Sequence, residues 1–177
     1  RLSIAGVIIA LHWITFFGAI DESNISITLA MFSTGAFFAS FIEPLIYKRT
    51  IIWYEIVFGG LVILGVFIIT QSEIKYLTGI LLGISSAFLS SLFAVLNGSF
   101  LKQHTATVIS FYEFLSGVFF ISVYILCFGE SFSTKFFSIS WADFKYLFIL
   151  ASICTAYAFI ASVHIMKVIS PYTVVLT

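Results

Sequence analysis

Most of this chain consists of apolar blocks of about twenty residues, separated by short polar breaks. An α-helix of that length crosses a hydrocarbon core of roughly 30 Å. The blocks are continuously apolar rather than alternating, and lipid leaves no backbone group without an internal partner, so we expect helices rather than barrel strands. The pattern predicts six spans, at 2–20, 25–47, 51–70, 76–100, 105–128 and 141–166, with the start of a seventh at Pro171.

Composition supports a polytopic membrane protein. The chain is 61% hydrophobic and 9% charged, whereas soluble domains carry roughly 25% charged residues. Its net charge is zero and it has no basic run, so nothing in the sequence suggests nucleic acid as a partner and we expect none. Cys127 and Cys154 lie inside apolar blocks without metal-ligand spacing, so we expect no metal or cofactor. The chain begins at Arg1 without a signal-peptide pattern and is interpreted as a fragment.

The polar breaks alternate in charge along the chain. One set, which includes the turn at Lys48 and Arg49, has basic residues and no acidic loop residue, whereas the other set is mostly acidic. Because Lys and Arg collect in cytoplasmic loops, we expect the first set to be cytoplasmic. The first set is Arg1, Lys48, Arg49, Lys102 and Lys167, and the second is Asp21, Glu22, Glu73, Lys75, Glu130, Lys135, Asp143 and Lys145.

A weak internal repeat is also present. A shift of about 147 places aligns Ser23 with Ser170, each following one span and opening the next, and predicts both as helix N-caps. The first and sixth spans are five crossings apart, so corresponding spans run in opposite directions. The fold class that we predict is therefore an all-α transmembrane bundle with inverted five-helix repeats, an architecture of many secondary transporters.

Three stretches carry a family pattern: LHWITFFGAI, ISITLAMFSTGAFFASFIEPLIYKR and WYEIVFGGLVILGVFII. Together they resemble the EamA domain of the drug/metabolite transporter superfamily. The most specific positions are Pro44, Lys48, Arg49, Glu55, Gly59, Gly60, Gly65 and Val66, followed by Gly79, where a second repeat opens.

The resemblance implies ten spans in two repeats, of which this chain holds the third span to the opening of the ninth. Residues 1–72 would end the first repeat and residues 73–177 would begin the second. Many members carry a Glu-Arg pair at the turn after the fourth span. Here Lys48 precedes Arg49, and Glu43 is the candidate to take that glutamate's place.

Glu113 is the most unusual residue, because a carboxyl group that deep in the fifth span is costly. Helical spacing puts small or polar residues on its face, which indicates a side turned toward protein or a cavity. We expect either a proton-coupling or substrate-contacting carboxylate, or a protonated side chain bonded to a neighbouring helix. The residues on its face are Ala106, Ser110, Ser116 and Gly117.

His12 lies at mid-depth in the first span with Thr15 on its face. It is a candidate for proton relay or substrate binding, and the alternative is a structural histidine bonded to a neighbouring hydroxyl. Trp13, Tyr112 and Tyr157 lie at depths where aromatic side chains line cavities, but in so aromatic a chain most such residues face lipid or fill the core.

Glu43 and Pro44 form a candidate hinge near the end of the second span, because the proline removes a backbone donor and predicts a kink. The alternative for Glu43, and the interpretation for Glu55, is a carboxylate solvated at the membrane surface. In the fourth span a stripe of small residues predicts close helix packing, and Asn97 is expected to bond across the bundle. The stripe is Gly79, Gly83, Ala87, Ser90, Ala94 and Gly98.

The function that we predict is secondary transport of a small metabolite, amino acid or drug-like solute across the cell (inner) membrane, with or without a coupled proton. Its expected partners are the bilayer, that solute and a second copy of the chain in a homodimer. Motifs of zinc proteases, serine hydrolases and phosphate-binding loops are missing from the sequence, so we do not expect an enzyme. The alternatives are an intramembrane enzyme that uses His12 and Glu113, or a membrane scaffold.

Overall fold

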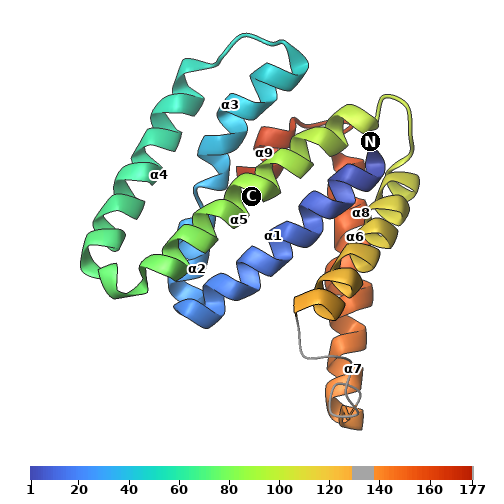
Figure 1. The fold of residues 1–177 in the computed structure, drawn as a ribbon. Helices are drawn as coiled ribbons and strands as arrows, with labels where there is room; N and C mark the ends of the chain where they lie inside the picture. Colours follow the sequence, from blue (N-terminus) through green and yellow to red (C-terminus); the bar gives the residue numbers. More distant parts are fainter. Residues whose placement is uncertain (129–137, 177) are drawn as a thin grey trace.

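The computed structural model describes residues 1–128 and 138–176, and within them every regular element is a helix (Figure 1). Six helical segments are long and apolar enough to cross a membrane, as predicted. The elements are α1 (Leu2–Glu22), α2 (Ile25–Phe32), α3 (Gly35–Tyr47), α4 (Trp53–Ser72), η1 (Ile74–Tyr76), α5 (Leu77–Phe100), α6 (Ala106–Phe128), α7 (Trp141–Ile149), η2 (Leu150–Tyr157), α8 (Ala158–Ile165) and α9 (Pro171–Leu176).

The second span is interrupted between α2 and α3. At the interruption the Ser33 hydroxyl donates to the Ala30 carbonyl at 2.6 Å and the Thr34 hydroxyl donates to the Met31 carbonyl at 2.7 Å. Hydroxyls that bond to carbonyls of their own helix compete with the helical ladder and bend it. Pro44 lies inside α3, which continues to Tyr47. An interruption thus lies at a Ser-Thr pair that the sequence analysis did not single out, and the kink at Pro44 stays a prediction.

The sixth span also differs from the predicted regular helix. Between α7 and α8 the backbone takes eight residues of π-helix, η2. A π-helix has more residues per turn than an α-helix, so the side chains that follow it point in different directions from those that α-helical spacing predicts. Such segments are common at functional positions. Side-chain directions inferred from 3.6-residue spacing therefore do not carry across from α7 to α8.

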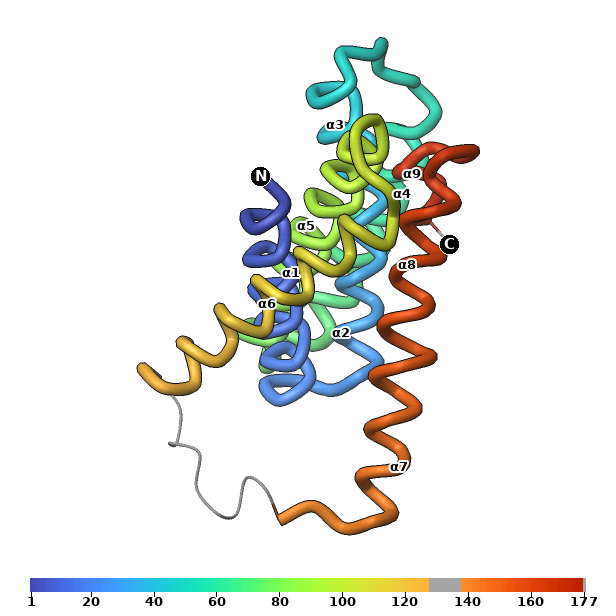
Figure 2. The backbone as a smooth tube through the Cα atoms, turned by 90° about the vertical axis from the view of Figure 1, so that its right-hand side faces the viewer, coloured from blue at the N-terminus to red at the C-terminus, as the bar shows by residue number. Residues whose placement is uncertain are grey.

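Helix α1 lies alongside α5 and α6 in both views (Figure 1, Figure 2). Glycines allow this approach: a Cβ atom at Gly6 would meet the backbone of Glu113, and one at Gly79 would meet the Ser23 side chain at 2.6 Å and the Ala19 carbonyl at 3.0 Å. A Cβ atom at Gly83 would likewise meet Met31 at 2.8 Å. The predicted packing role of the small residues in the fourth span is confirmed at these positions.

The arrangement of the connections agrees with the predicted grouping of basic loops. In Figure 1 the N-terminus and the α3–α4 and α5–α6 connections lie at one end of the bundle, and Lys102 Nζ is 5.2 Å from the Tyr47 ring centroid. The spans α1 and α7–α8 run in opposite directions (Figure 2). The cytoplasmic assignment and the inverted repeat stay predictions, and Glu130 and Lys135 lie outside the described residues.

The two predicted N-caps have different outcomes. Ser170 accepts a hydrogen bond from the Thr173 N–H at 3.2 Å, and α9 begins at Pro171, as expected. At the other end of the proposed repeat the cap is Asn24, whose side chain accepts from the Ile27 N–H at 3.0 Å. Ser23 instead donates to the Ala19 carbonyl, because it still stacks on the last turn of α1.

The packing predicts different outcomes for two glycine-to-alanine changes. Gly6→Ala should lower the free energy of unfolding by about 1–3 kcal/mol, because the new methyl group meets the backbone of α6 and forces the helices apart. Gly65→Ala is the matched control: nothing described lies within 4 Å of its Cβ position. It should be neutral or stabilise by up to about 1 kcal/mol. Unfolding of the purified protein in detergent measures both changes, and equal effects would contradict the α1–α6 contact.

Candidate functional site

Glu113 is fully buried and bonds to another helix. Its Oε2 accepts from Asn97 Nδ2 of α5 at 3.1 Å, and both residues are 0% exposed. The predicted inward face of Glu113 is confirmed at Ala106 and Ser110, which are buried beside it on α6, and so is the predicted bond of Asn97 across the bundle. Two buried oxygens of this pair, Asn97 Oδ1 and Glu113 Oε1, have no hydrogen-bond partner among the described residues.

An unpartnered buried acceptor costs about 1–3 kcal/mol. Neither arginine, lysine nor histidine forms an ion pair with Glu113 in the described part of the chain. Asn97 and Glu113 are therefore buried in the bundle interior with one oxygen each that can still accept a hydrogen bond. Such a group is expected at a site that receives a ligand or a proton.

A cavity of about 260 Å³ adjoins this pair, and Asn97 is part of its wall. The cavity lies where the interruption between α2 and α3 faces α5, α8 and α9, with Phe32 and Gly35 on the two sides of the break. Glu113 does not line the cavity and is connected to it through Asn97. The lining residues are Phe32, Gly35, Ser90, Phe93, Ala94, Asn97, Phe159, Ser162, Val163, Met166, Val174 and Val175.

His12 is held as the structural interpretation describes. Its Nδ1 lies 2.9 Å from the Ser86 hydroxyl and 3.1 Å from the Ser86 carbonyl, and its ring packs on Phe32 and Phe93 with centroids 5.6 Å apart in each case. The Thr15 hydroxyl is used within α1, where it donates to the Leu11 carbonyl at 2.9 Å and the His12 carbonyl at 3.0 Å. Neither residue lines the cavity.

The three aromatic candidates are not at the cavity. Trp13 packs against Phe114 with centroids 6.4 Å apart. Tyr112 is 49% exposed and Tyr157 is 70% exposed on the outer faces of their helices. The cavity instead has Phe32, Phe93 and Phe159, which depth alone does not distinguish from the other phenylalanines of the chain.

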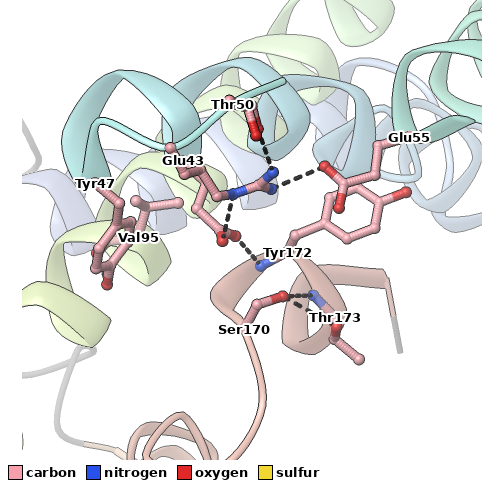
Figure 3. Close-up of polar contacts among 9 residues, drawn as sticks. Glu43, Tyr47, Thr50, Glu55, Val95, Ser170, Tyr172 and Thr173 are labelled. Carbon is pink, nitrogen blue, oxygen red and sulfur yellow. Dashed lines mark hydrogen bonds and ion pairs between the residues drawn. The ribbon is translucent and has the colours of Figure 1, made fainter. Parts of the chain in front are cut away.

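A second polar cluster at the α3–α4 turn contains Glu43 and Glu55 (Figure 3), which both pair with Arg49. Arg49 Nε donates to Glu43 Oε1 at 3.0 Å and Nη2 donates to Glu55 Oε2 at 2.8 Å. Glu43 is 4% exposed and Glu55 is 5% exposed. The interpretation of these carboxylates as surface-solvated groups is therefore wrong, because both are buried and paired with Arg49.

The same cluster reaches the far end of the chain. The other oxygen of Glu43, Oε2, accepts from the Tyr172 N–H at 2.7 Å (Figure 3). That N–H lies in the first turn of α9, where a carboxylate also meets the positive end of the helix dipole. Glu43 thus ties α3 to α9 across 129 positions of sequence, and its role as a hinge stays a prediction.

The two carboxylates favour the charged form of Arg49. Burial of the guanidinium acts to lower the pKa of Arg49, but hydrogen bonds and charge from Glu55 and Glu43 outweigh it, and the pKa is raised above its ordinary value. Lys48, the other residue of the predicted topology pair, takes a left-handed conformation with φ 53° and ends α3. Only the second residue of the pair joins the cluster.

An open cavity of about 480 Å³ lies beside the cluster. Arg49, Lys102 and Lys167 line it together, so three of the predicted basic breaks meet at one end of the bundle. Arg49 is occupied by its two carboxylates, whereas Lys102 lies over the Tyr47 ring.

In comparisons with protein-family models, curated proteins and solved structures, the chain has no significant match. The resemblance to the EamA domain is therefore carried by the quoted residues alone.

The cluster predicts a large stability effect at Arg49. Arg49→Ala should lower the free energy of unfolding by about 3–5 kcal/mol, because it leaves two buried carboxylates without a counter-charge. Arg49→Lys should recover only part of that loss, since one ammonium group does not reproduce the guanidinium fork. Lys75→Ala is the control, because Lys75 pairs with Glu73 at 3.7 Å on the surface and should change stability by less than about 1 kcal/mol. Similar losses at Arg49 and Lys75 would show that the cluster is solvated.

Proposed function

We propose that the protein is a secondary transporter that moves a small solute through the membrane by alternating access. The observation that carries the proposal is the cavity at the interruption between α2 and α3. Solute sites of many secondary transporters lie where a broken helix opens onto a cavity between the two halves of the bundle. Here the cavity wall combines α2 and α3 of the first half with α5, α8 and α9 of the second.

The polar groups have separate roles in this proposal. Asn97 contacts the solute, and Glu113 behind it supplies a proton-exchanging or charge-balancing carboxyl group. The Glu43–Arg49–Glu55 cluster closes one end of the bundle by holding α9 to the α3–α4 turn. Alternating access requires such contacts at one end to be released while the other end closes.

The rival functions have less support. An intramembrane enzyme that uses His12 and Glu113 together needs the two side chains to act on one substrate. Instead His12 bonds to Ser86 and Glu113 bonds to Asn97, and neither side chain lines the cavity. A scaffold does not require an interior cavity with unused acceptors.

Transport is tested without knowing the solute. Proteoliposomes that carry the full-length protein are incubated with a small-molecule extract of cells, and their contents are analysed by mass spectrometry beside protein-free liposomes. A transporter should enrich at least one extract component unchanged. Ser162→Leu, which fills the cavity from α8, should abolish the enrichment, whereas Ser85→Ala on the outer face of α5 should not. A newly formed compound would indicate an enzyme, and contents equal to those of empty liposomes would contradict transport.

Glu113→Gln tests the role of the carboxyl group. Glutamine keeps an acceptor for Asn97 Nδ2 but does not titrate, so the variant should fold with a stability close to that of the parent. If transport is driven by protons, the variant should lose its dependence on a pH gradient while still exchanging solute across the membrane. Uptake at several imposed gradients measures this. A gradient response equal to that of the parent would remove Glu113 from the coupling mechanism.

A further inference from the structure

The polar wall of the cavity between α2–α3, α5, α8 and α9 has an unusual hydrogen-bonding character. It consists of Asn97 and two serines, Ser90 and Ser162. Asn97 Nδ2 donates one of its two N–H groups to Glu113, and Asn97 Oδ1 has no hydrogen-bond partner among the described residues. The hydroxyls of Ser90 and Ser162 make no hydrogen bond to another described residue. The wall therefore offers three oxygens, Asn97 Oδ1 and the two serine hydroxyls, that can accept a hydrogen bond from a solute.

The charge around the cavity points in the same direction. No Lys, Arg, His, Asp or Glu is among the described residues that line it. Glu113 is connected to the cavity through Asn97, and it forms no ion pair with a cation in the described part of the chain. At the break the negative end of α2 adjoins the positive end of α3, so the partial charges of the two helix ends largely cancel there. A positive solute would supply the charge that the buried carboxyl group lacks.

The apolar wall fits the rest of such a solute. Phe32, Phe93 and Phe159 contribute three aromatic rings, and the Phe93 and Phe159 centroids are 6.0 Å apart. Ring faces attract cations and pack well against apolar groups. The volume of about 260 Å³ is below the roughly 300–1,000 Å³ of pockets for drug-sized ligands, so the solute is small.

We propose that this cavity binds a small amphipathic amine, with its ammonium group donating to Asn97 Oδ1 and its apolar body among the three phenylalanines. This inference names the solute class of the transport site and rests on the proposed function for its physiological meaning.

Three matched probes test the solute class: 2-phenylethylamine, 2-phenylethanol and 3-phenylpropanoate. They share a phenyl body and differ in having a cationic, neutral or anionic end. Binding to the purified full-length protein is measured by calorimetry and by thermal stabilisation. The amine should bind at least about tenfold more tightly than either of the others, as expected for a hydrogen bond from a charged donor. Equal binding of all three, tighter binding of the alcohol or the anion, or no binding of the amine would overturn the proposal.

Variants locate the site. Asn97→Leu should weaken amine binding roughly 10- to 100-fold, and Ser162→Leu should weaken it as strongly by filling the cavity. Ser162→Leu leaves the Asn97–Glu113 bond untouched, so it decides the result if Asn97→Leu fails to fold. Ser85→Ala, on the exposed face of α5, should bind like the parent. Amine binding that survives Ser162→Leu would place the ligand elsewhere and overturn the proposal.

The binding and transport measurements can fail separately. Amine binding that depends on Ser162 and Asn97, without uptake of the amine or of any extract component into proteoliposomes, would reject transport and keep the solute site. Uptake of extract components that include no amine, together with no binding of 2-phenylethylamine, would reject the solute class and keep transport.

Discussion

Lipid neither offers hydrogen-bond partners nor drives apolar helices together, so this bundle depends on how closely its helix backbones approach. Gly6 brings α1 against the backbone of α6, and Gly79 and Gly83 bring α5 against α1 and α2. At that spacing side-chain hydroxyls reach the next helix: Ser91 of α5 donates to the Gly35 carbonyl at 2.7 Å. Close packing is thus what allows polar groups to be satisfied inside the membrane-spanning part.

The buried carboxyl groups of Glu43 and Glu113 differ in the partners that the packing gives them. Glu43 shares Arg49 with Glu55 and also receives the Tyr172 N–H, so its charge is compensated by a cation and a helix end. Glu113 has an amide as its partner and keeps an unpartnered oxygen. A compensated cluster holds helices together, whereas an uncompensated carboxyl group beside a cavity retains capacity for a ligand or proton. This contrast is the reason for assigning a structural role to the first and a functional role to the second.

The sequence alone determined the features that follow from local periodicity. The lengths of the apolar blocks predicted helices and their number because a helix must span the hydrocarbon on its own. Helical spacing also predicted that Glu113 faces inward, since its neighbours at three and four positions are small or polar. The small residues of the fourth span predicted close packing. Each of these inferences depends on residues within one helix, where sequence distance and spatial distance are related by geometry.

Only the tertiary structure decided which helices supply the hydrogen-bond and ion-pair partners of the polar side chains. Ser33 and Thr34 bend the second span by bonding to their own helix, whereas the hydroxyls of Ser90 and Ser162 at the cavity have no partner among the described residues, although all four residues carry a hydroxyl group. The sequence predicted a topology role for Arg49, and the fold adds its ion pairs with Glu43 and Glu55. Tyr172 meets Glu43 across 129 positions, a separation at which no local pattern indicates contact. The cavity is likewise formed by α2, α3, α5, α8 and α9 together, because a void in a bundle is a property of the gaps between helices rather than of any one of them.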